Sequence, residues 1–276
     1  MFSYEYLMLR IALPDEAVTA VYPALDALRG KRNELTDAFF GGLDISESVR
    51  FTSDESGINI DTVWLAVVII LSERTLCMYN TRKLSEELFY DTMEDIRIWT
   101  LRSRRDFGTW GIHSEFGWLS NHLRATLFRL GRLQFETVDF DRDEYSSGAT
   151  VISRGDRVIN IHVPDDGRPL TRELRYDSYK KASSFFGLDC FICRSWLLYP
   201  EHKKFLRPDS NVLDFMRDFD IVDFGTEKPS DNMWRVFGYH EIYDPKRLPR
   251  DTGMRRAYAD WLASGGMPGW GYGIMV

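Results

Sequence analysis

Two residues in the second half of the chain have side chains suited to proton transfer. His162 lies near the end of the segment 157–163 (RVINIHV), and histidine side chains in general can accept a proton at neutral pH. Glu136 and Gln134 lie two residues apart in the segment 133–140 (LQFETVDF), so alternation along a strand places both on one face. We expect His162 and Glu136 to be catalytic and Gln134 to bind substrate.

These residues also have a structural interpretation. A histidine at the end of a strand is often only hydrogen-bonded to its surroundings, and a polar pair such as Gln134 and Glu136 can simply face solvent. Both interpretations therefore stay open for all three residues.

The residues that follow His162 form a second candidate feature. The strand 158–163 should end at Pro164, Asp165 to Gly167 should form a turn, and Pro169 should fill the first turn of a helix that extends to Phe186. The first N–H groups of a helix have no partner within it, so this end can bind an anion such as a pyrophosphate. The alternative is an ordinary connection between a packed strand and a packed helix.

The first 130 residues show the periodicity of helices. Apolar residues recur at helical spacing from Pro14 to Leu130, with the last helix expected over 115–130. The most apolar run, 63–71 (VWLAVVIIL), is about half of the ~20 residues that span a bilayer, so we expect a buried helix there. We predict a helical domain over residues 1–130.

From Gly131 onward the pattern changes to strands alternating with helices. We expect the strands 133–140, 149–152 and 158–163 to form an antiparallel meander, and the glycine-rich tail 265–273 to be mobile or docked by its aromatic residues. Further strands are expected over 190–198, 220–224 and 233–239, with helices over 169–186 and 211–219. The predicted fold class is α+β, with the second domain over residues 131–276.

Composition narrows the class of protein. The 276 residues carry a net charge of −7, which gives no general electrostatic reason to bind nucleic acid. The start of the sequence lacks the pattern of a signal peptide, and three cysteines are an odd set that suits a reducing compartment. Cys190 and Cys193 have C-x-x-C spacing without a second ligand pair, so no metal site is expected. We predict a cytoplasmic protein that does not bind a membrane.

Several long phrases of the sequence resemble a known family. They are WTLRSRRDFGTWGIHSEFGWLSNHLRATLFRLGRLQFE, INIHVP with DDGRPL, SYKKASSFF, CRSWLLYP and SNVLDFMRDF. Together they resemble the bacterial acyltransferase-domain family, which has a helical N-terminal domain and a GNAT-like C-terminal domain. The order of the predicted strands is similar to that of the GNAT fold.

This resemblance implies an acyl-CoA-dependent N-acyltransferase. In GNAT enzymes the fourth strand and the helix after it hold the pantetheine and pyrophosphate of the acyl-CoA, which implies cofactor contacts at Val163, Gly167, Arg168 and Ser195. Trp118 belongs to an aromatic and cationic cluster that binds substrate or joins domains. The acceptor would be an amine of a small molecule or peptide, and the sequence leaves the oligomeric state open.

The phosphate loop departs from the usual GNAT pattern. Standard enzymes have glycines two residues apart in this loop, whereas residues 165–169 (DDGRP) contain one glycine, two carboxylates and a proline. The tyrosine that often acts as general acid is absent from 211–219. These departures favour a second hypothesis, a non-catalytic GNAT-like binding or assembly module.

Overall fold

The computed structural model describes residues 2–276 and divides the chain into two compact units. The first unit contains residues 1–130 together with 164–166, and the second contains residues 131–163 and 167–276. Each unit is described by itself below.

The first unit is helical except for one short strand. Its α5 helix carries the buried run Leu65 to Leu71, and Asn59 caps it by accepting a hydrogen bond from the N–H of Asp61 at 2.8 Å. No helix within residues 2–276 combines the length and apolar character needed to cross a bilayer. The elements are α1 (Tyr4–Arg10), α2 (Asp15–Ala27), η1 (Arg29–Lys31), α3 (Arg32–Phe40), α4 (Ser46–Ser56), α5 (Ile60–Thr81), α6 (Glu86–Phe107), α7 (Phe116–Leu123) and β1 (Leu127–Leu130).

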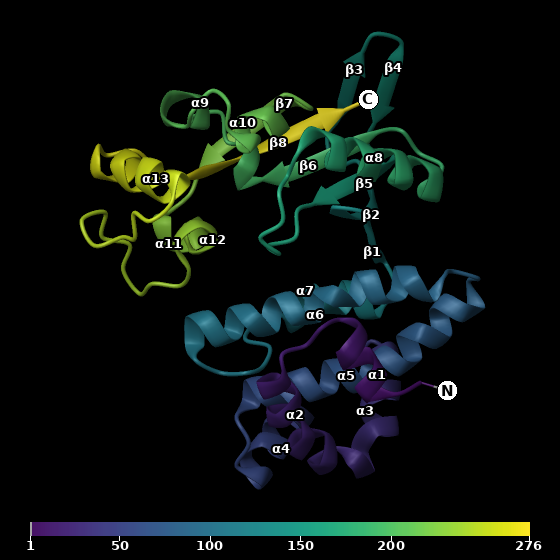
Figure 1. Ribbon diagram of the computed structural model, residues 1–276. Helices are drawn as coiled ribbons and strands as arrows, with labels where there is room; N and C mark the ends of the chain where they lie inside the picture. Colours follow the sequence, from purple (N-terminus) through teal and green to yellow (C-terminus); the bar gives the residue numbers. More distant parts are fainter. Residues whose placement is uncertain (1) are drawn as a thin grey trace. The chain divides into compact units, whose positions relative to one another are not determined.

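The second unit is built on a mixed sheet in which its strands follow the order β2-β5-β6-β8-β7 (Figure 1). The pair β5 and β6 is parallel, and the other neighbouring pairs in this order are antiparallel. The strands β3 and β4 form a separate hairpin. The strands are β2 (Leu133–Asp139), β3 (Glu144–Ser147), β4 (Thr150–Ser153), β5 (Arg157–His162), β6 (Phe191–Ser195), β7 (Asp220–Thr226) and β8 (Gly269–Met275).

Helices and turns connect these strands. The longest helix of the second unit, α8, lies between β5 and β6 in the sequence. The connecting elements are α8 (Arg172–Phe186), η2 (Trp196–Leu198), α9 (His202–Phe205), α10 (Asn211–Met216), α11 (Pro229–Asn232), α12 (Trp234–Phe237) and α13 (Gly253–Ala263).

The two faces of this sheet bury different partners. On one face, here named the helix face, Phe191 of β6 lies 5.6 Å from Tyr179 of α8 between ring centroids. On the opposite face, the hairpin face, Val158 and Ile192 belong to one buried cluster with Ile152 of the β3–β4 hairpin. Successive residues of a strand point to opposite faces, so position along β5 or β6 decides which core a side chain enters.

Several predicted elements are wrong, and the last strand is the clearest case. Residues 269–275 form the strand β8, which the prediction of a tail that is mobile or docked by its aromatic residues did not include, and 233–239 contain the helix α12 instead of a strand. The glycines of β8 permit close packing, because a Cβ on Gly271 would lie 2.2 Å from the carbonyl oxygen of Leu198. The predicted meander is also wrong, because β2 pairs directly with β5.

The boundaries of two predicted helices also differ from those in the structure. The helix expected over 115–130 ends at Leu123 and is followed by β1. The helix expected to start near Pro169 begins at Arg172, because the hydroxyl of Thr171 caps it by accepting from the N–H of Leu174. Threonine is a preferred capping residue, and the polar loop before it is therefore longer than expected.

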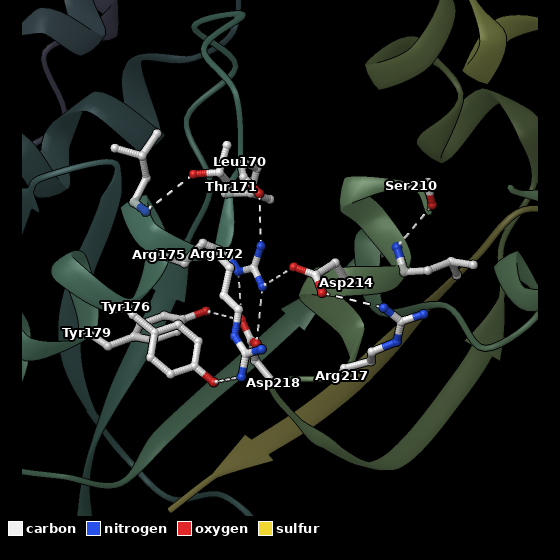
Figure 2. Close-up of polar contacts among 12 residues, drawn as sticks. Leu170, Thr171, Arg172, Arg175, Tyr176, Tyr179, Ser210, Asp214, Arg217 and Asp218 are labelled. Carbon is white, nitrogen blue, oxygen red and sulfur yellow. Dashed lines mark hydrogen bonds and ion pairs between the residues drawn. The ribbon is translucent and has the colours of Figure 1, made fainter. Parts of the chain in front are cut away.

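A fully buried arginine links α8 to the segment that contains α10 (Figure 2). The Nε of Arg175 lies 2.7 Å from Asp218, and its Nη2 lies 3.0 Å from Asp214. Tyr179 donates a hydrogen bond to Asp218 at 3.0 Å, and burial together with Asp218 raises the pKa of Tyr179, which keeps this donor protonated. Burial alone would lower the pKa of Arg175, but the two aspartates raise it.

Removing the charge of Asp218 tests this network. Asp218→Asn should lower the free energy of unfolding by about 2–4 kcal/mol, because it leaves a buried guanidinium with incomplete compensation. Urea denaturation followed by tryptophan fluorescence measures the change. The matched variant Asp209→Asn alters an exposed aspartate paired with Arg207, so its effect should stay below about 0.5 kcal/mol. Equal effects of the two variants would contradict this account.

Candidate functional site

The two predicted catalytic residues meet on the hairpin face of the sheet. Glu136 lies in β2 and His162 in β5, and the register of these antiparallel strands pairs Gln134 with His162 and Glu136 with Asn160. The Nε2 atom of His162 lies 2.8 Å from a carboxylate oxygen of Glu136, and both side chains are about one quarter or less exposed. A strand pair thus holds a histidine and a carboxylate in contact.

Asn160 is a member of this site that the sequence analysis missed. Its side-chain amide donates to Glu136 at 3.1 Å and lies 3.1 Å from Nε2 of His162. The signal was available in the sequence, because Asn160 precedes His162 by two residues and alternation places both on one face. A second donor to Glu136 fixes the direction of its carboxylate.

The contact between His162 and Glu136 determines the protonation of the ring. An ionised carboxylate can only accept hydrogen bonds, so Nε2 of His162 donates in this contact when Glu136 is ionised. In the neutral ring the lone pair is then on Nδ1. The arrangement suits a histidine that accepts a proton while Glu136 orients the ring and stabilises its positive charge.

The parallel strands beside this site are paired over a short distance only. The ladder between β5 and β6 joins Ile159 to Phe191 and Asn160 to Ile192, whereas β6 continues to pair with β8 as far as Ser195. The N–H of Ile159 donates to the carbonyl of Cys190 at 2.9 Å, and peptide groups that face one edge recur every second residue. The pairing of Asn160 with Ile192 uses the N–H of Ile161 as the last donor of this ladder. The carbonyl of Ile161 and the N–H of Val163 therefore face the same edge beyond the last paired groups.

The loop between β5 and α8 contains two carboxylates that lie close to arginines. Asp166 is fully buried and forms an ion pair with Arg129, which also lies 2.9 Å from Glu94. Asp165 lies 4.0 Å from Arg102. The two aspartates are therefore not isolated negative charges, which removes one of the reasons for doubting an anion site in this loop.

The predicted cofactor residues occupy the loop and the two adjacent strands. Gly167 has a positive φ of 71°, a conformation that favours glycine, and Arg168 after it is exposed. Ser195 lies at the end of β6, where its hydroxyl accepts a hydrogen bond from the N–H of Leu197 at 3.2 Å. Their roles, and that of Val163, stay predictions.

Contacts within the protein fix the positions of the two predicted substrate residues, Gln134 and Trp118. Gln134 is buried and pairs in register with His162. In the first unit, the indole N–H of Trp118 donates to Asp95 at 2.8 Å, and the same buried carboxylate accepts from Trp99 at 2.9 Å. Asp95 therefore fixes the orientation of the Trp118 ring.

Two other chemistries receive no support. Burial raises the pKa of Cys193 to about 12, so its thiol stays protonated and is a poor nucleophile. Among residues 2–276, no three histidine, cysteine, aspartate or glutamate side chains gather in a way that could hold a metal ion.

Comparison with known families identifies both parts of the chain. Residues 127–275 match the GNAT-like C-terminal domain, and residues 3–125 match the N-acyltransferase N-terminal domain. The chain belongs to the GNAT-like N-acyltransferase family. The resemblance seen in the sequence is confirmed, and so is the α+β fold with a helical N-terminal part. The sequence matches no curated protein.

Solved structures of acyltransferases share the fold. An acyltransferase in complex with decanoyl-CoA and teicoplanin is 20% identical, with a TM-score of 0.77 over 99% of this chain and 87% of that one. A tryptophan-to-alanine mutant of an acyltransferase in complex with octanoyl-CoA is 21% identical, with the same TM-score and coverage. An acyltransferase in complex with decanoyl-CoA is 22% identical, with a TM-score of 0.76 over 99% of this chain and 86% of that one.

Proposed function

We propose that this chain transfers an acyl group from acyl-CoA to an amine. The observation that carries the proposal is the short ladder between β5 and β6, beyond which the edges of two neighbouring strands are no longer joined to each other. An extended pantetheine arm can hydrogen-bond to such edges much as a strand would. Membership of the GNAT-like N-acyltransferase family supports the same function.

In this proposal the acyl-CoA follows β5 toward the start of α8. The pantetheine bonds to the carbonyl of Ile161, the N–H of Val163 lies near the thioester, and the pyrophosphate lies at the loop that contains Gly167 and Arg168. Ser195 borders the pantetheine from β6. The neighbouring structures that contain decanoyl-CoA, octanoyl-CoA or CoA support a thioester of coenzyme A as the donor.

The reaction would be direct attack on the thioester. The amine nitrogen bonds to the thioester carbon, and the N–H of Val163 stabilises the oxyanion that forms. The amine proton passes to the imidazole of His162, which lies in contact with Glu136. The carbon–sulfur bond then breaks, and the CoA thiolate leaves and takes up a proton.

The acceptor in this proposal is an amine of a small molecule or peptide. Two of the solved acyltransferases are in complex with teicoplanin or 10C-teicoplanin, which supports an acceptor larger than a simple amine. Gln134 and Trp118 are the residues proposed to contact it.

Donor binding is the first test. Isothermal titration of the purified chain with acetyl-CoA, octanoyl-CoA, decanoyl-CoA and an acyl carrier protein should show binding of at least one acyl-CoA. Mass spectrometry of mixtures with amine panels should then find an acylated product. Absence of binding by every donor would reject the function, and binding without any transfer would favour a non-catalytic module.

His162→Ala should separate chemistry from binding. We expect kcat to fall by about 10²- to 10⁴-fold, the usual contribution of a general base, while the Kd for octanoyl-CoA stays within about twofold. The rate is measured by the release of the free thiol of CoA. Glu144→Ala, which changes an exposed glutamate of β3, should have no effect. An unchanged kcat in His162→Ala would exclude this histidine as the base.

Combining two substitutions tests whether Glu136 acts through His162. Glu136→Ala alone should lower kcat, because the ring loses the group that orients it, but the double variant with His162→Ala should be no slower than His162→Ala itself. Steady-state kinetics of the wild type, the two single variants and the double variant gives the coupling energy between Glu136 and His162. Multiplicative losses would show that Glu136 acts independently of the histidine.

A further inference from the structure

Two buried arginines hold the carbonyl groups of the loop before α8. In the second unit, Arg132 donates to the carbonyl of Arg168 at 2.9 Å through Nη2 and to that of Pro169 at 3.0 Å through Nε. Arg175 donates to the next carbonyl, that of Leu170, at 2.9 Å (Figure 2). Three successive carbonyl groups are thus bound by two arginines, Arg132 and Arg175, which are 7% and 0% exposed.

Holding these carbonyls fixes the direction of the N–H groups. A trans peptide unit is planar, and its N–H points opposite to its carbonyl. Because the carbonyls of Pro169 and Leu170 point to Arg132 and Arg175, the N–H groups of Leu170 and Thr171 point away from these buried side chains. Pro169 has no N–H, so the bond to the carbonyl of Arg168 fixes the backbone but directs no donor.

Each arginine is held in place by further contacts. Arg175 is fixed by Asp214 and Asp218, which compensate its charge, so its contribution to the loop is mainly one of geometry. The backbone N–H of Arg132 donates to the hydroxyl of Ser178 at 2.8 Å, which ties the start of β2 to α8. A Cβ on the preceding residue, Gly131, would lie 2.8 Å from the same hydroxyl, so a glycine suits this approach.

We propose that Arg132 and Arg175 are positioning residues that orient the loop 168–171 for the pyrophosphate of acyl-CoA. The inference rests on the proposed function. A loop with several glycines can turn its N–H groups toward a phosphate through backbone freedom, and this loop has Gly167 alone. Here the side chains of Arg132 and Arg175 bind the carbonyls from behind and impose the orientation that glycines would otherwise permit.

Arg132→Met tests the clamp with two donors that differ in the pyrophosphate. Octanoyl-CoA contains the pyrophosphate and octanoyl-pantetheine does not. In this proposal, only the binding of octanoyl-CoA therefore depends on the loop 168–171. We expect the Kd for octanoyl-CoA to rise by about 10- to 100-fold and the Kd for octanoyl-pantetheine to stay within about twofold, both by isothermal titration. If Arg132 only stabilised the fold, its replacement would weaken the binding of both donors. That result would contradict the proposal that Arg132 orients the loop 168–171.

Arg132→Lys separates geometry from charge. Lysine keeps the positive charge but lacks the planar fork that reaches two carbonyls, so octanoyl-CoA binding should remain weakened by at least about fivefold. Full recovery with lysine would mean that charge alone suffices and would reject the clamp. Arg154→Met, at an exposed arginine paired with Asp143, is the matched control and should bind both donors as the wild type does.

The wild-type titrations distinguish failure of the proposed function from failure of the proposed role of Arg132 and Arg175. If the wild-type chain binds neither octanoyl-CoA nor octanoyl-pantetheine, the proposed function fails. If it binds both and Arg132→Met does too, with unchanged Kd values, the function stands and the clamp is wrong.

Discussion

The sheet of the second unit depends on where the parallel pairing between β5 and β6 ends. Each of these strands has an antiparallel neighbour on its other edge, β2 for β5 and β8 for β6, and those ladders continue past the point where the parallel ladder stops. The outer neighbours therefore hold the two strands while their inner edges separate. Peptide groups that lose a partner in this way must bond to something else, since unpaired backbone groups are costly to bury.

The proposed chemistry and the proposed donor site are joined through one strand. β5 ends at His162, whose side chain lies on the hairpin face, and Val163 follows directly with its backbone at the edge, so one segment positions both the proposed base and the proposed oxyanion donor. The register with β2 adds Glu136, and the loop after β5 leads to the clamped segment before α8. Rigid strands are well suited to hold such groups at fixed distances.

Local patterns predicted much of this arrangement. Alternation placed Glu136 and Gln134 on one face, and the β-branched residues before Pro164 marked β5 correctly. The sequence did not reveal that β2 pairs directly with β5, nor that Arg132 and Arg175 converge on one loop, because both depend on contacts between distant segments. Glycine-rich residues 269–275 were misjudged for a similar reason, since contacts with distant segments, among them Leu198, Tyr199 and Phe219, explain why side chains are excluded there.

The position of β8 has a consequence for how the sheet is assembled. This strand is the last of the sequence, yet it lies between β6 and β7, which precede it by many residues. During synthesis, β6 and β7 must therefore wait with open edges until residue 275 has left the ribosome. A waiting edge can pair with another chain, so the interval before β8 is added exposes the sheet to aggregation.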